Sequence, residues 1–192
     1  MGWETRRFFT LDELPNPDPE IVVVGGIANV RGRLRQLGIA LAESEMDYPE
    51  ELVPFLGRKI WTTTLEELVN NEDQWNVFAK PQQETKKFAG KVFRSYTDFA
   101  GLIDREDPTV VWCSEVVEFL TEWRCFIRYG EILDVRRYKG RWDTQPDAAM
   151  IEQVVAAFRN APAAYALDVG LDKDGAMKLV EINDGHSLGT YG

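Results

Sequence analysis

The strongest constraint on the fold of this chain is a pair of short apolar segments near its end, joined by a tight turn. Apolar residues alternate with small or polar ones from Tyr165 to Leu171, which is typical of a half-buried β-strand. Residues 179–183 form a second short strand after the turn Asp172-Lys-Asp-Gly175. The sequence therefore predicts a β-hairpin.

Three oxygen-bearing side chains are expected to meet on this hairpin. Folding about the Asp174–Gly175 junction sets Asp168 opposite Glu181, and Asn183 faces the same way as Glu181 because side chains alternate across a strand. Two carboxylates and an amide suit Mg²⁺, which prefers oxygen ligands. The alternative is a solvated strand face with ordinary acidic residues. The asparagine two positions after the glutamate favours the metal site.

Length and composition predict a soluble globular protein. The 192 residues are 44% hydrophobic and include no apolar run long enough to span a bilayer. The first residues lack the apolar stretch of a signal peptide, so we expect a cytoplasmic location.

Charge and cysteine content exclude other classes. The net charge of -10 argues against broad electrostatic binding to nucleic acid or anionic membrane. Cys113 and Cys125 fall in apolar, strand-like runs and are expected to be small buried hydrophobic residues. The chain has no C-x-x-C pair, so a zinc site is not expected.

Strand and helix signals alternate along the chain and predict an α+β fold with antiparallel sheet. Strands are expected at residues 21–24, 59–62, 76–81, 92–94, 109–113, 122–128 and 132–139, and helices at 28–37, 48–56, 64–70, 97–105 and 148–160. A capping box at Thr64 and an N-cap at Asp147 support two of the helices. We expect an N-terminal α/β lobe at residues 1–74 and a second unit at 75–192.

Taken in order, several short motifs make the chain resemble an ATP-grasp domain. They are Phe78-Ala-Lys80-Pro81, Lys86-Lys87-Phe88-Ala-Gly90, Ser114-Glu115-Val-Val117, Glu122-Trp-Arg124, Arg136-Arg137, Asp168-Val-Gly170 and Val180-Glu181-Ile-Asn183. The chain is most similar to a poorly characterised clade that has one arginine and two lysines in its nucleotide site. The resemblance implies two lobes with antiparallel sheets that clasp ATP, and residues 75–192 as the nucleotide-binding region. Members of this clade usually continue past Gly192 with a further helix.

The resemblance implies a role for each nucleotide-site residue. Lys80 and Lys87 would hold phosphates, the main chain of Glu115 and Val117 would bind adenine, and Glu122 would bind the ribose hydroxyls. Without the resemblance, the lysines are ordinary surface residues and the glutamates are an acidic surface cluster. Asp168, Glu181 and Asn183 would hold one or two Mg²⁺ ions.

Arginines supply further candidates for anion binding. Arg124 lies on the same strand face as Glu122, and the hairpin through Gly130 returns either Arg136 or Arg137 beside it, depending on the register. Phosphates or a substrate carboxylate would neutralise such a pair, although neighbouring glutamates could also do so. Arg58 is a weaker candidate for the arginine of the clade.

For such a site the resemblance implies an ADP-forming carboxylate–amine ligase, with catalytic arginines Arg124, Arg136 and Arg137. A carboxylate of a small molecule or peptide would attack the γ-phosphate of ATP, and an amine would capture the acylphosphate. The alternatives are a kinase-type phosphotransferase on the same scaffold and a catalytically idle nucleotide-binding or interaction module. His186 is left as a possible substrate contact. The sequence identifies neither substrate nor oligomeric state.

Overall fold

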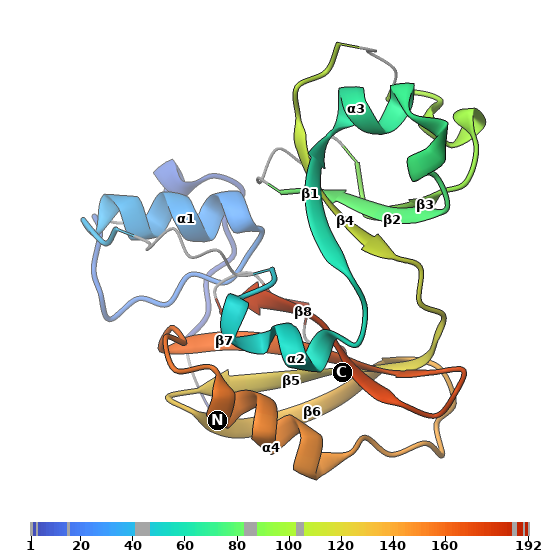
Figure 1. Cartoon of the computed structure of the whole chain (residues 1–192). Coiled ribbons are helices and arrows are strands. Elements are labelled where there is room, and N and C mark those ends of the chain that lie inside the picture. Colours follow the sequence, from blue (N-terminus) through green and yellow to red (C-terminus); the bar gives the residue numbers. More distant parts are fainter. Residues whose placement is uncertain are drawn as a thin grey trace.

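A computed structural model describes residues 2, 4–14, 16–40, 47–82, 88–102, 106–185, 188–189 and 191. Its centre is two four-stranded antiparallel sheets (Figure 1). Sheet A has the order β1-β4-β2-β3, with β1 Ile60–Thr64, β2 Val77–Pro81, β3 Lys91–Phe93 and β4 Val110–Glu115. Sheet B has the order β6-β5-β7-β8, with β5 Phe119–Arg128, β6 Glu131–Lys139, β7 Ala164–Asp172 and β8 Met177–Asp184. The predicted α+β fold class is confirmed.

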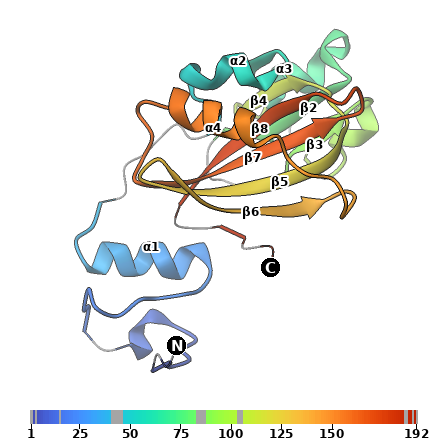
Figure 2. The ribbon, with the colours of Figure 1, turned by 90° about the horizontal axis from the view of Figure 1, so that it is seen from below.

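The described residues form four α-helices, three of which pack on a face of a sheet. They are α1 Ile27–Gln36, α2 Val53–Leu56, α3 Leu65–Asn70 and α4 Ala148–Ala157, with short 3-10 turns at Leu11–Glu13, Glu50–Leu52, Glu72–Gln74 and Tyr96–Phe99. α3 packs on sheet A, whereas α2 and α4 pack on sheet B. α1 packs on neither sheet face in the two ribbon views (Figures 1 and 2), but its Arg31 lies 3.9 Å from the Asp184 carboxylate at the end of β8. None of the helices in the described part of the chain is long and apolar enough to cross a membrane.

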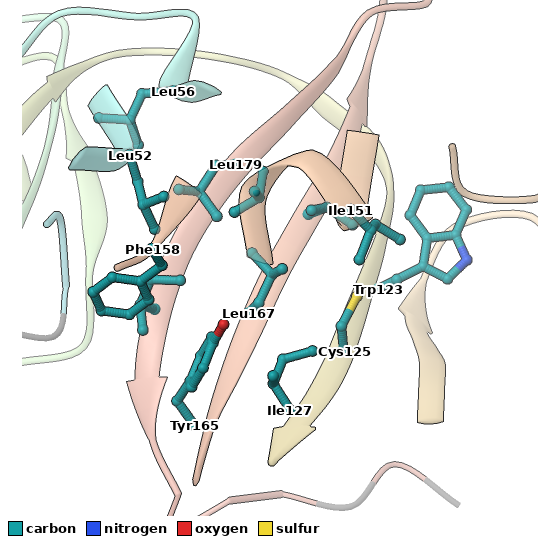
Figure 3. Packing of buried hydrophobic residues seen from close by; sticks show 13 residues of the cluster. Leu52, Leu56, Trp123, Cys125, Ile127, Ile151, Phe158, Tyr165, Leu167 and Leu179 are labelled. Atoms are coloured by element: carbon teal, nitrogen blue, oxygen red, sulfur yellow. The ribbon is translucent and has the colours of Figure 1, made fainter. Parts of the chain in front are cut away.

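The larger hydrophobic core lies between sheet B and the helices α2 and α4 (Figure 3). Every second residue of the central strands points into it, as Cys125, Leu167 and Val169 do. Because strand side chains alternate, Arg124 and Asp168 must project from the opposite face of sheet B. We call this second face the polar face of sheet B.

Local sequence signals explain where two of the helices begin. The Thr64 side chain accepts a hydrogen bond from the Glu67 backbone N–H, and the Asp147 carboxylate accepts one from Met150 N–H. Each bond satisfies a backbone donor that the first turn of a helix leaves unpaired. The predicted caps are both confirmed.

The final hairpin has the predicted register. Asp168 pairs with Glu181, and a β-bulge follows on β8 at Val180. The Asp172 carboxylate closes the turn by accepting hydrogen bonds from the backbone N–H groups of Asp174 and Ala176, and Gly175 adopts a φ of 82°. This left-handed backbone is the conformation that glycine adopts most readily.

Two secondary-structure predictions are wrong. Residues 21–24 form no strand, and the Val22 and Val24 side chains are 71% and 83% exposed. Four β-branched residues favour a strand locally, but no neighbouring strand pairs with them among the described residues. Of the helix expected at residues 97–105, only the 3-10 turn Tyr96–Phe99 is present, and residues 103–105 lie outside the described part.

Sheet A contains residues from both sides of the boundary expected at residue 74. β1 precedes that boundary and pairs along its whole length with β4, which follows it. The division into residues 1–74 and 75–192 stays a prediction.

Candidate nucleotide and metal site

The polar face of sheet B brings together the three residues predicted to hold metal. Asp168 and Glu181 are cross-strand partners on β7 and β8. The Asn183 amide nitrogen lies 3.2 Å from Glu181 Oε1 and 3.5 Å from Asp168 Oδ2. The Asn183 amide nitrogen thus faces the two carboxylates. To bind a cation through its oxygen, the Asn183 amide would have to rotate, and this rotation breaks only these two long hydrogen bonds.

Arg124 neutralises Asp168 through a bidentate ion pair. Arg124 Nε and Nη2 donate to the two carboxylate oxygens at 2.8 and 2.7 Å, and the two side chains are only 9% and 3% exposed. Burial raises the pKa of Asp168 although Arg124 opposes the shift, while the hydrogen bonds to Asp168 raise the pKa of Arg124. Arg124 therefore stays charged and is held in one orientation at the centre of the sheet.

Lys80 reaches this group from sheet A. Its ammonium donates to Glu181 Oε2 at 2.5 Å and to Asp47 Oδ1 at 2.7 Å, and it lies 4.8 Å from the centre of the Tyr48 ring. Burial opposes its charge, but the negative charges of Glu181 and Asp47 raise the pKa of Lys80 above its usual value. The same ion pair lowers the pKa of Glu181 despite burial. The two sheets are thus joined by a charged contact at the predicted metal residues.

The segment that begins at Asp47 lies along the outer edge of β8. The backbone N–H of Ile182 donates to the Asp47 carbonyl at 3.1 Å. Farther along, the Arg58 guanidinium donates to the carbonyls of Leu179 and Val180 at 2.7 and 2.6 Å. These bonds satisfy backbone groups that an edge strand otherwise leaves unpaired.

Arg58 is therefore occupied by protein contacts. Its third hydrogen bond goes to the carbonyl of Leu56 at 3.0 Å, and its guanidinium lies 5.9 Å from the Tyr48 ring centre and 5.8 Å from that of Phe119. Burial lowers the pKa of Arg58, and the neighbouring Tyr48 and Glu181 oppose this shift. The nucleotide role of Arg58 stays a prediction, and the contacts here support a role in holding β8.

The other two arginines lie apart from Asp168. Arg124 pairs with Arg136 across β5 and β6, as one of the two predicted registers requires. Arg136 is half exposed and binds Asp134 at 2.6 Å. Arg137 pairs with Trp123 and donates to the Gly140 carbonyl at 2.5 Å. Of the three arginines, only Arg124 contacts the predicted metal residues.

Glu122 and two tyrosines flank Arg124. Glu122 accepts hydrogen bonds from Tyr138 Oη at 2.8 Å and Lys139 Nζ at 2.5 Å. The Tyr191 ring stacks on that of Tyr138, with centres 4.8 Å apart, and lies 5.1 Å from the Arg124 guanidinium. A nucleotide that uses Glu122 must therefore compete with Tyr138 and Lys139 for its carboxylate oxygens.

The predicted adenine hinge follows β4. The Glu115 backbone N–H donates to the Lys59 carbonyl at 3.2 Å, and the Glu115 carboxylate accepts from Lys59 N–H at 2.9 Å. Among the described residues, the Glu115 carbonyl accepts a side-chain hydrogen bond from Ser114 Oγ at 3.1 Å, which leaves a second lone pair for a ligand. Val117 is half-buried in the connection between β4 and β5.

Lys87 and His186 lie outside the described residues. Within the described ranges, no group of three or more His, Cys, Asp and Glu side chains could hold a metal by itself. A cation at Asp168 and Glu181 would need Asn183, water or phosphate oxygens to complete its coordination, which is how Mg²⁺ is commonly bound.

Sequence reasoning missed Asp47, Tyr48, Trp112, Tyr138 and Tyr191. Tyr138 could have been found, because it lies two residues after Arg136 on β6 and strand alternation favours the same face. Trp112 is likewise the cross-strand partner of Lys80. Asp47 and Tyr48 precede a short helix and carry no periodic signal, so only the tertiary structure places them at Lys80.

Comparisons with known proteins agree with this architecture. The model of an ATP-grasp domain family, family 2 of the clade named for one arginine and two lysines, matches residues 55–192. No curated protein sequence matches the chain. A structure of ATP-grasp ligase PsnB complexed with minimal precursor superposes with a TM-score of 0.54 and 14% identity, covering 81% of this chain and 60% of that one.

Two further structures come from a different group of enzymes. N5-carboxyaminoimidazole synthetase from Staphylococcus aureus complexed with ADP has a TM-score of 0.50 and 6% identity, covering 70% of this chain and 40% of that one. The ADP complex of purK, N5-carboxyaminoimidazole ribonucleotide synthetase, has a TM-score of 0.53 and 12% identity, covering 72% and 42%. The chain thus spans 60% or less of the length of the proteins in these structures. At sequence identities this low, the structural similarity establishes the fold alone.

The family model covers most of the chain and both sheets. It also includes Lys80, Arg124, Asp168, Glu181 and Asn183, which meet at the charged contact between the sheets. The chain belongs to the ATP-grasp domain family, in family 2 of the clade named for one arginine and two lysines.

Proposed function

We propose that the protein is an ATP- and Mg²⁺-dependent ligase that joins a carboxylate to an amine through an acylphosphate. One observation carries the proposal. Asp168 and Glu181 lie directly opposite each other on the polar face of sheet B, within reach of a lysine from sheet A. ATP would bind between the two sheets at this contact.

The residues present fit a magnesium ion. Asp168, Glu181 and Asn183 provide hard oxygen ligands, and only two of them are charged, which leaves positions for phosphate oxygens and water. When bound, Mg²⁺ would neutralise the phosphates and polarise the γ-phosphoryl group. PsnB structures complexed with Mg and ADP support this assignment by analogy of fold.

The cations of the site would act on the phosphates. Lys80 and Arg124 are already charged and buried, and after exchanging carboxylate partners for phosphate oxygens they would stabilise charge on a transferred phosphoryl group. Lys87 would add a third cation. Arg136, the cross-strand partner of Arg124, would bind the substrate carboxylate, whereas Arg137 pairs with the core residue Trp123 and so projects from the opposite face of sheet B.

The adenosine part of ATP would lie beside β4 and β5. The free lone pair of the Glu115 carbonyl would accept from the adenine amino group, and the Val117 N–H would donate to the ring. Glu122 would accept from the ribose hydroxyls after exchanging its present partners Tyr138 and Lys139.

Neither cysteine of the chain is suited to accept the phosphoryl group, so we assign that role to the substrate. Burial raises the pKa of Cys113 and of Cys125 to about 12, so neither thiol is a nucleophile near neutral pH. Both side chains are also buried in the cores of the sheets. A substrate carboxylate, from a small molecule or from a peptide, would therefore attack the γ-phosphate, and a substrate amine would displace the phosphate to form an amide.

Hydroxylamine trapping tests the proposed intermediate. The protein is incubated with ATP, Mg²⁺ and pools of metabolite or peptide carboxylates, with hydroxylamine in place of the amine. We expect a hydroxamate that requires ATP and Mg²⁺ and is absent with the Glu181→Gln variant. A phosphorylated product that resists hydroxylamine would indicate a kinase, and no nucleotide turnover with any pool would indicate an idle binding module.

A further inference from the structure

Lys80 has an unusual balance of charge around it. Its side chain is only 13% exposed, yet its ammonium contacts two carboxylates, Glu181 at 2.5 Å and Asp47 at 2.7 Å. One carboxylate is enough to neutralise one ammonium. The second carboxylate, that of Asp47, therefore needs an explanation.

Asp47 is held by both sheets independently of its ion pair. Its carbonyl accepts a hydrogen bond from Ile182 of β8, the residue after Glu181. The adjacent Tyr48 packs edge-on against the Trp112 ring on β4, with ring centres 5.3 Å apart, and Trp112 is the cross-strand partner of Lys80. Asp47 is thus fixed at the place where sheets A and B approach each other.

Metal binding would change the partners of Lys80. A divalent cation at Glu181 attracts the carboxylate that now binds the lysine and repels the ammonium. Without another anion, Lys80 would be driven out of a buried position beside the metal. Asp47 is the carboxylate that remains for it, and the Tyr48 ring offers a second favourable contact.

We propose that Asp47 is a positioning residue that holds the Lys80 ammonium at the phosphates once Glu181 binds metal. The inference rests on the proposed function, because it assumes that Glu181 is a metal ligand and that Lys80 binds phosphate. Asp47 acts through Lys80 and does not touch the nucleotide itself.

A double-mutant cycle measured by calorimetric titration tests this role. Asp47→Asn, Lys80→Met and the double variant are each titrated with ATP plus Mg²⁺ and with adenosine. Asp47→Asn should weaken binding of MgATP by about tenfold to a hundredfold, the range produced by loss of a charged hydrogen bond, and leave adenosine binding unchanged. In the Lys80→Met background the same substitution should have no further effect on MgATP.

Controls separate positioning from folding. Asp143→Asn removes an acid from an exposed ion pair with Arg141 and should bind MgATP like the original protein. Asp47→Glu keeps the carboxylate and should recover part of the lost MgATP affinity. Thermal unfolding of each variant shows whether it is folded before titration.

Two results would overturn the inference while leaving the proposed function intact. One is that Asp47→Asn lowers the MgATP affinity by the same factor in the original protein and in the Lys80→Met background. The other is MgATP affinity of Asp47→Asn equal to that of the original protein. If the original protein binds no MgATP, both the proposed function and the role of Asp47 are wrong.

Discussion

The buried ion pair between Arg124 and Asp168 makes a quantitative prediction, because the chain contains an exposed pair of almost the same geometry. Arg141 binds Asp143 through Nε and Nη2 at 3.0 and 2.6 Å, compared with 2.8 and 2.7 Å in the buried pair. The exposed side chains are 77% and 41% accessible, whereas the buried ones are 9% and 3%. The two pairs share this geometry and differ in burial, and the exposed pair is local in sequence whereas the buried pair joins β5 to β7.

Removing one partner of the buried pair leaves an uncompensated charge in a medium of low polarity. We expect Arg124→Met to lower the free energy of unfolding by about 3–5 kcal/mol. In a protein of this size that corresponds to a fall in Tm of roughly 6–20 °C. The double variant Arg124→Met/Asp168→Leu should be more stable than Arg124→Met alone, because it leaves no unpaired charge of this ion pair in the buried site.

Urea unfolding followed by circular dichroism provides the assay. The matched control Arg141→Met should unfold at the same urea concentration as the original protein, since an exposed ion pair contributes little. If Arg124→Met and Arg141→Met have the same midpoint, burial does not govern the energy of these pairs. The double variant should also lose Mg²⁺-dependent ATP binding, which would show that the ion pair is kept for function rather than for stability.

Three further outcomes test other parts of the molecule. Gly170→Ala should lower the free energy of unfolding by about 1–3 kcal/mol in urea titrations, because the new Cβ would overlap the Phe119 ring; unchanged stability would contradict this packing. The hydrogen bond from Lys178 lowers the pKa of Asp172, so the Asp172 carboxylate stabilises the fold fully above its unfolded-state pKa of 3.8, and this stabilisation is lost as the pH falls through the lower pKa of the folded state. Asp172→Asn should therefore show a smaller fall in Tm in acid than the original protein, and identical profiles of Tm against pH would refute this. Lys87→Ala should weaken ATP binding in calorimetry but leave adenosine binding unchanged, and an equal loss for both ligands would exclude a phosphate role.

The parts of the fold that could be predicted are those with a local cause. The final hairpin follows from alternation and from a turn whose Asp172 carboxylate and Gly175 backbone fix the register. This register alone places Asp168 opposite Glu181. The caps at Thr64 and Asp147 are likewise encoded within four residues of sequence.

The parts that could not be predicted depend on distant contacts. Residues 21–24 carry a strand pattern, but a strand requires a partner, and sequence periodicity does not supply one. Asp47 is 33 residues from Lys80 and contacts it only because the segment that follows Asp47 runs along the edge of β8. Arg136 lies apart from Asp168 for a different reason, since β5 separates β6 from β7 in the sheet, and its guanidinium binds Asp134 on its own strand.

Calorimetric titration of ATP in the presence of Mg²⁺ and in the presence of EDTA tests the central claim most directly. If Asp168, Glu181 and Asn183 form the metal site, Mg²⁺ strengthens ATP binding, and Glu181→Gln removes this gain while the protein keeps its fold by circular dichroism. Equal ATP affinity with Mg²⁺ and with EDTA would contradict the metal site, and with it the proposed ligase.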